Sequence, residues 1–207
     1  MLAMAERLTV TARSPLRPAV MRLAVALLYT AGLRRGELLR LTLTDVDLHH
    51  GALHIRESKF HKSRIVPLSP DACRELRVYL QQRRQLPLSD AADAPLLCFV
   101  KGRVRAYKGA GVTEGIKTLF QLAGVYSADG RTPRVHDFRH SFAVGSLLRW
   151  YRQGADVQSK LPKLAMYMGH VSIVSTAYYL RWIPELAAAA SHQYQRHYGH
   201  LINGEIA

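Results

Sequence analysis

The sequence predicts a mainly helical α+β fold with one small three-stranded antiparallel sheet. In several segments, apolar residues recur with the period of an α-helix. Three short β-type segments lie close together within residues 45–68, separated by turns. The 207 residues, 48% of them hydrophobic, are enough for one full domain, or two small ones, with a substantial core.

The first helix is expected at residues 17–31, where apolar side chains return every three or four positions. Gly32 suits the C-terminal end of this helix, because glycine readily adopts the left-handed backbone conformation. A second, short helix is expected at residues 36–41.

Three β-type segments follow, at residues 45–48, 52–55 and 64–68. The turns between them lie at residues 49–51 and 58–63, and the second turn is strongly basic. Neighbouring strands joined by short turns pair antiparallel, so we predict a three-stranded antiparallel sheet.

The remaining chain is predicted to be helical with two irregular stretches. Ser69-Pro70-Asp71 is typical of a helix start, because serine caps free N–H groups and proline suits the first helical position. Residues 85–95 are expected to form a loop, and residues 101–108 carry four cations and no acid. Further helices are expected at residues 112–124, 136–152, 161–168, 172–180 and 184–197.

Charge gives the first indication of function. The chain carries 29 lysines and arginines against 15 acidic residues, a formal net charge of +14. Such an excess usually serves a polyanion, because cationic side chains displace the counterions condensed around phosphates. The basic residues are not confined to one amphipathic helix or tail, which favours nucleic acid over a membrane surface.

The cysteines and the hydropathy pattern exclude other classes. Cys73 and Cys98 match no CxxC pattern, so we predict two buried, reduced thiols rather than a disulfide framework or a metal site. No stretch approaches the ~20 apolar residues needed to cross a bilayer. The N-terminus lacks the apolar core of a secretory signal. We therefore expect a soluble, cytoplasmic protein that does not bind membranes.

Four separated segments carry side chains suited to phosphate chemistry. They are centred on Arg34, on Lys59, on His136 with Arg139, and on His170 with Tyr179 nine positions later. Arg34 is expected between two helices, Lys59 in the basic turn between two strands, and His136 at the start of a helix.

In this order and spacing, the segments resemble the tyrosine recombinase (phage integrase) superfamily over roughly residues 17–197. Gly32–Leu38 is similar to the family's first box, Gly-Leu-Arg-x-Gly/Ser-Glu-Leu. His136–Ala143 resembles His-x-Leu-Arg-His-x-Phe-Ala, and Met168–His170 followed by Tyr179 resembles Leu-Gly-His and the nucleophile. No single box is specific, but four in register are very specific.

The resemblance implies a catalytic domain that cuts and rejoins DNA through a 3′-phosphotyrosine and a free 5′-hydroxyl. Tyr179 would be the nucleophile, and its distance from the Gly-His pair selects it over the adjacent Tyr178. Arg34 and Arg139 would clamp the phosphate, because guanidinium groups hold two oxygens in a fixed geometry and stay charged.

The other roles are also implied by the resemblance. Lys59 resembles the general acid for the departing 5′-oxygen, with Lys62 as a rival, and His136 resembles the residue that assists proton transfer. His170 would donate a hydrogen bond to the phosphate oxygens. Glu37 matches a common family position and is interpreted as a support for the arginines.

The resemblance further implies double-stranded DNA as a partner, with a homo-oligomer, a tetramer, on DNA and a monomer without it. Neither a cofactor nor a metal is expected, since the 10 histidines offer no complete ligand set with a carboxylate. Residues 1–207 are expected to form one catalytic domain with its core at 17–197 and a C-terminal tail at 198–207. About 16 residues precede the region of resemblance, which begins at residue 17, so the family's usual N-terminal core-binding domain is expected to be absent.

Two other functions stay open. A type IB topoisomerase would use similar chemistry to relax supercoils, although the boxes at 136–140 and 168–170 look more like recombinases. A basic DNA-binding protein that no longer cuts is the second alternative, and the intact set of candidate catalytic residues argues against it. The sequence does not indicate the DNA site or whether the reaction is integration, excision or resolution.

Overall fold

The computed structural model describes residues 1–56, 63–170 and 191 of the chain. The chain divides into two compact units, unit 1 at residues 1–139 and unit 2 at residues 140–207, and the boundary falls within one helix. Each unit is described by itself. None of the helices within the described residues is both long enough and apolar enough to span a bilayer.

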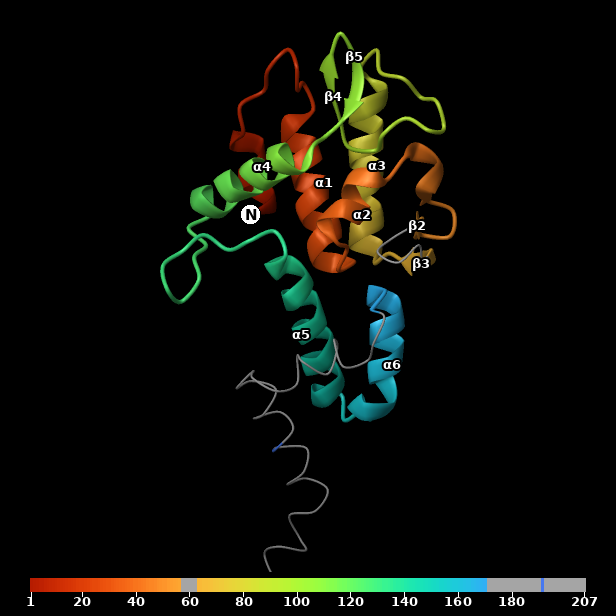
Figure 1. The fold of residues 1–207 in the computed structure, drawn as a ribbon, viewed down its shortest axis with the longest axis vertical. Helices are drawn as coiled ribbons and strands as arrows, with labels where there is room; N and C mark the ends of the chain where they lie inside the picture. The colour runs from red at the N-terminus through yellow and green to blue at the C-terminus, as the bar shows by residue number, and fades with distance from the viewer. Residues whose placement is uncertain (57–62, 171–190, 192–207) are drawn as a thin grey trace, which may run out of the picture. The chain divides into compact units, whose positions relative to one another are not determined.

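Helix α1 (Arg17–Thr30) forms the centre of unit 1 (Figure 1). Eight of its residues are buried, because its apolar side chains meet neighbours on several sides. It packs against the 3-10 helix η1 (Leu2–Arg7), α3 (Pro70–Arg84) and α4 (Gly109–Leu122). The prediction of this helix is confirmed, and the structure ends it one residue earlier.

Helix α2 (Arg35–Arg40) follows after a short connection. Gly32 lies in this connection with a φ of 59°, a conformation that side chains other than glycine rarely adopt. The predicted C-terminal role of this glycine and the short second helix are both confirmed.

The predicted sheet is confirmed as three antiparallel strands in the order β1 (Val46–Asp47), β2 (Ala52–Ile55) and β3 (Arg64–Pro67). Leu53 of β2 pairs with Val66 of β3, and both side chains are fully buried. Because side chains alternate along a strand, this pairing fixes which face of the sheet meets the core.

Helix α3 begins as the sequence predicts. The Ser69 hydroxyl accepts a hydrogen bond from the Ala72 N–H, and Pro70 is the first helical residue. An ion pair holds α3 to α1, since Arg22 contacts both oxygens of Glu75 at 2.6 and 2.7 Å. The register of the two helices is thus set by a bidentate contact.

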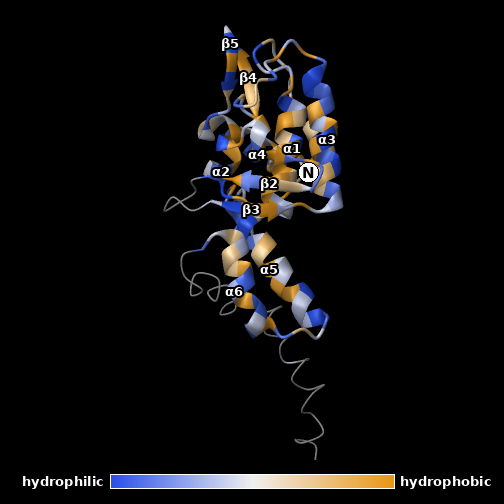
Figure 2. Ribbon diagram, turned by 90° about the vertical axis from the view of Figure 1, so that its right-hand side faces the viewer, coloured by the Kyte–Doolittle hydropathy of each residue, from blue (hydrophilic) through white to orange (hydrophobic). Residues whose placement is uncertain are grey.

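A hairpin follows that the sequence analysis did not predict. Strands β4 (Cys98–Lys101) and β5 (Arg103–Ala106) pair antiparallel around Gly102, whose φ is 69°. In Figure 2, β4 is mostly orange, whereas β5 carries blue segments. Cysteine 98 of this hairpin and Cys73 of α3 are both buried and free, which confirms the prediction for the two thiols.

Helix α4 begins three residues earlier than predicted, although Gly109 and Gly111 are poor helix formers. Its contact with α1 explains another glycine. A Cβ atom added at Gly115 would lie 2.5 Å from the Met21 sulfur, so a larger residue here would force the Met21 side chain to move. Tertiary packing thus outweighs the weak local propensity of this segment.

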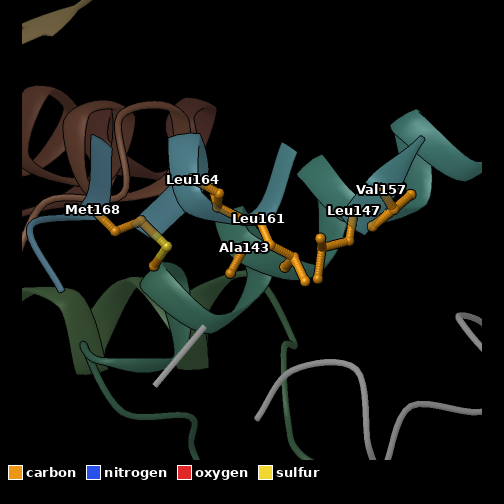
Figure 3. Packing of buried hydrophobic residues seen from close by; sticks show 6 residues of the cluster. All are labelled: Ala143, Leu147, Val157, Leu161, Leu164 and Met168. Atoms are coloured by element: carbon orange, nitrogen blue, oxygen red, sulfur yellow. The ribbon is translucent and has the colours of Figure 1, made fainter. Parts of the chain in front are cut away.

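Unit 2 is built on α5 (Asp137–Arg152) and α6 (Val157–Met168), and α5 was predicted closely. Apolar side chains from the two helices pack against each other in Figure 3. The buried members are Ala143, Leu147, Val157, Leu161, Leu164 and Met168.

Helix α6 begins four residues before the predicted position. The Asp156 carboxylate accepts hydrogen bonds from the N–H groups of Gln158 and Ser159, and Pro162 lies inside the helix instead of marking its start. The helix predicted at residues 172–180, the helix predicted at 184–197 apart from residue 191, and the predicted tail lie outside the described residues.

Candidate active site

Arg34 is held at the N-terminus of α2 by its own sequence neighbourhood. It is the residue that precedes the helix, and Glu37 is the third helical residue. The Glu37 carboxylate accepts from the Arg34 backbone N–H at 2.9 Å and from Arg34 Nη1 at 2.7 Å. The spacing Arg-x-x-Glu therefore both caps the helix and orients the guanidinium. Glu37 was interpreted as a support for the arginines of the site, and the structure confirms this for Arg34.

The same carboxylate binds a second arginine from the sheet. Arg64, the first residue of β3, donates from Nη1 and Nη2 to the two Glu37 oxygens, both at 2.9 Å. The Glu37 residue is only 2% exposed. Burial raises the pKa of Glu37, but the hydrogen bonds from Arg64 and Arg34 outweigh burial and lower this pKa to about 2. Glu37 is thus an anion that links α2 to β3.

Sequence reasoning misses Arg64. A cation close to Lys59 and Lys62 is usually part of a solvated basic turn, and its partner Glu37 lies 27 positions away. Alternation along β3 places Arg64 on the same face as the buried Val66, but it does not indicate which carboxylate this side chain meets. Only the folded sheet brings this side chain to the carboxylate.

We expect Glu37→Gln to remove a stabilising term that depends on pH. The folded pKa of about 2 lies below the ordinary 4.5, so ionised Glu37 stabilises the fold above pH 4.5. This stabilisation, about 3 kcal/mol, is lost as the pH falls from 4.5 toward 2. Urea unfolding between pH 2 and pH 7 should show a lower stability at pH 7 and a flatter acid limb for the variant. Glu114→Gln, at an exposed position of α4, is the control and should leave the acid limb as it is in the unaltered chain. An unchanged acid limb in Glu37→Gln would contradict the assignment.

Arg139 is buried at the start of α5, with 2% of its surface exposed. Its Nη1 donates to the carbonyl oxygen of Gly32 at 2.6 Å. Gly32 lies two residues before Arg34. Phe138 anchors this end of the helix by stacking on Phe120, with ring centres 5.2 Å apart. The structure thus brings the two predicted arginines together, although 105 positions separate them in the sequence.

His136 lies immediately before α5 and is exposed. It lines a pocket of about 620 Å³ with residues of α2 and α4, among them Arg35 and Lys117. Arg35 Nη1 donates to the Thr113 hydroxyl at 3.0 Å, which joins the two helices at the pocket. Arg35, Lys117 and Arg134 give the pocket lining a positive charge. None of the described lining residues is acidic, so the pocket attracts anions.

His170 follows the end of α6 in unit 2. Gly169 has a φ of 66°, and the N–H groups of Gly169 and His170 bond the carbonyls of Met166 and Ala165 at 2.9 and 2.8 Å. This is a Schellman ending, which needs glycine at the left-handed position. The Gly-His pair is therefore explained in part by the helix end, which sets the direction in which the chain leaves at His170.

Lys59, Lys62, Tyr178 and Tyr179 lie outside the described residues, so their roles stay predictions. Among the described residues, no three His, Cys, Asp or Glu side chains lie together in a way that could hold a metal ion. The described candidate residues of unit 1 are thus Arg34 with its support Glu37, Arg139 and His136, and unit 2 carries His170.

Comparison with known proteins places this geometry in a family. The sequence profile of the phage integrase family matches residues 3–184. The putative integrase/recombinase y4rE of Sinorhizobium fredii is 38% identical over 177 residues, which cover 86% of this chain and 56% of that protein. The chain therefore spans a little over half the length of this relative.

Solved structures of recombinases share this fold. The crystal structure of XerA recombinase is 26% identical, with a TM-score of 0.66 over 86% of this chain and 56% of that one. XerH site-specific recombinase, crystallised with a palindromic difH substrate, is 25% identical, with a TM-score of 0.66 over 92% of this chain and 49% of that one. The predicted fold class, a mainly helical tyrosine recombinase catalytic domain with a small antiparallel sheet, is confirmed. Matched over most of its length, the chain belongs to the phage integrase family of tyrosine recombinases.

Proposed function

We propose that the chain is the catalytic part of a site-specific DNA recombinase that cleaves and rejoins strands through a 3′-phosphotyrosine. The observation that carries this proposal is the arginine pair, Arg34 held by Glu37 and Arg139 held by the Gly32 carbonyl, in a chain of this family. The XerH relative was crystallised with DNA in a post-cleavage complex, which supports DNA as the substrate. We place the reaction in the cytoplasm.

In this proposal the Tyr179 oxygen attacks the scissile phosphorus, and the bond to the 5′-oxygen breaks. Negative charge grows on the non-bridging oxygens, where Arg34 and Arg139 stabilise it as fixed, permanently charged donors. The phosphotyrosine conserves the phosphodiester bond energy, so a second DNA 5′-hydroxyl can displace Tyr179 and reseal the strand.

The remaining groups manage protons and hydrogen bonds. His170 donates to the same phosphate oxygens, and His136 assists proton transfer at the nucleophile. Lys59 gives its proton to the departing 5′-oxygen, since an alkoxide is a poor leaving group without one. The protein thereby supplies all the reacting groups from its own side chains.

The role of Lys59 can be separated from that of the arginines. DNA with a 5′-bridging phosphorothiolate releases a sulfur that leaves without a proton. We expect this substrate to restore cleavage by Lys59→Ala but not by Arg34→Ala, as measured by single-turnover strand cleavage. Lys62→Ala is the matched control and should cleave ordinary DNA normally. If the sulfur substrate rescues Lys62→Ala instead, Lys62 is the general acid.

The function itself is tested with a nicked suicide duplex that carries sequences flanking the gene. Cleavage next to the nick releases a short strand end that diffuses away, so the covalent adduct accumulates and survives denaturing gels. A DNA-binding protein that does not cut would bind this duplex without an adduct. Supercoil relaxation without recombination between two sites would favour the topoisomerase alternative.

We also propose that the chain is a monomer in solution and forms a tetramer on paired DNA sites, since strand exchange needs four cleavage events. Light scattering of the free chain should give the mass of one copy. With a duplex carrying the site, the same measurement should give four copies on two duplexes. A free tetramer, or a single copy that completes recombination, would overturn this assembly.

A further inference from the structure

The β4–β5 hairpin presents three cations on one face. Its register pairs Lys101 with Arg103 and Phe99 with Arg105. Directly paired residues point to the same side of a sheet, and side chains alternate along each strand. Lys101, Arg103 and Arg105 therefore share one face, here named the basic face, and all three residues are exposed.

The hairpin is fixed to unit 1 at several points. The Val100 N–H donates to the Arg13 carbonyl at 2.7 Å, and the Tyr107 hydroxyl contacts the Ser14 hydroxyl at 3.1 Å. Buried Cys98 accepts from the fully buried Arg83 at 3.1 Å. An isolated two-stranded hairpin is barely stable in water, so these contacts are what give the basic face a defined position.

The charges of the basic face are not balanced within the fold. Some other arginines of unit 1 pair with nearby acids, as Arg22 does with Glu75 and Arg134 with Asp137. Within the described ranges, none of the three cations of the basic face forms an ion pair with a carboxylate. Lys101 and Arg103 even lie directly opposite each other, and like charges in this position destabilise a hairpin.

A polyanion would remove this repulsion. Arg103 and Arg105 are two residues apart on one strand, which separates them by roughly 6.6 Å. This arrangement offers a row of cations to a regularly charged chain rather than a pocket for one small anion. In both views of the molecule, the hairpin lies at the end of unit 1 far from β2 and β3 (Figures 1 and 2).

We propose that the basic face binds backbone phosphates of duplex DNA at a distance from the phosphate held by Arg34 and Arg139. The inference rests on the proposed function in taking DNA as the polyanion. It adds a second, sequence-independent contact, because cations on phosphates position a protein on DNA without reading bases. The hairpin thus extends the footprint of unit 1 along the duplex.

The test compares two variants that each lose three positive charges. One carries Lys101→Gln, Arg103→Gln and Arg105→Gln. The matched control carries Arg74→Gln, Arg77→Gln and Arg84→Gln, which removes three exposed arginines of α3. Fluorescence anisotropy of a labelled duplex, titrated at several salt concentrations, gives the affinity and its salt dependence for each full-length chain.

We expect the hairpin variant to bind at least roughly tenfold more weakly at low salt, with a slope of log K against log salt that is shallower by about 2 to 3. The control should keep the slope of the unaltered chain. Equal slopes in the two variants, or no salt-dependent binding by the unaltered chain, would overturn the inference.

The suicide-duplex assay on the unaltered chain separates this inference from the proposed function. Adduct formation together with equal slopes rejects the hairpin contact alone. A changed slope without any adduct rejects the cleavage function and leaves the DNA contact in place.

Discussion

Replacing Tyr179 by phenylalanine is expected to abolish covalent DNA adducts completely. The substitution keeps the aromatic ring and removes only the hydroxyl that would attack phosphorus, so DNA affinity should change little. The measurement is adduct formation on a suicide duplex, together with anisotropy on the same DNA. The expected loss of adducts is total, because no other group takes the place of the attacking hydroxyl.

The adjacent tyrosine provides a matched control. Tyr178→Phe makes the same chemical change one position earlier and should still form adducts. Adducts from Tyr179→Phe combined with none from Tyr178→Phe would move the nucleophile by one residue. Adducts from both single variants would show that neither tyrosine is essential.

Arg139→Lys is expected to lower the cleavage rate by roughly 10²–10³-fold, the usual effect of losing one preorganised donor to a developing oxyanion. Lysine keeps the charge but loses the planar fork, and it cannot donate to the Gly32 carbonyl and to a phosphate with the same geometry. Single-turnover cleavage of saturating duplex isolates the chemical step from binding.

Because Arg139 is buried, the same substitution could act through the fold, and thermal unfolding must be measured beside cleavage. The control is Arg131→Lys, at an exposed arginine that pairs with Asp129. We expect this control to cleave at a near-normal rate. A slow but stably folded Arg139→Lys supports the clamp. Near-normal cleavage by this variant would exclude Arg139 from the transition state.

The parts of the fold that the sequence predicted are those with strong local signals. Ser69 and Pro70 start α3 because a capping hydroxyl and a fixed φ act within one turn. The basic turn and its flanking apolar strands likewise predicted β2 and β3 as an antiparallel pair. The β4–β5 hairpin was missed because its cations are poor strand indicators and its turn is a single glycine, Gly102.

The candidate site was predicted as residue types but not as a set of contacts. Arg34 and Arg139 could be named from the family's boxes, whereas the Gly32 carbonyl that holds Arg139 could not. Arg64 gave no local signal, because its role depends on how β3 lies against α2. Contacts between residues far apart in the sequence follow from packing, which no short pattern records.

The carboxylate of Glu37 affects how Arg34 would bind a DNA phosphate. Two neighbouring guanidinium groups repel each other, but Glu37 contacts both, so Arg34, Arg64 and Glu37 together carry a charge of only +1. Arg34 is therefore already ordered in the free protein, and the side-chain entropy of ordering it is lost during folding rather than during association. DNA that reaches this side chain finds its geometry set in advance, so more of the contact energy is available to hold the phosphate.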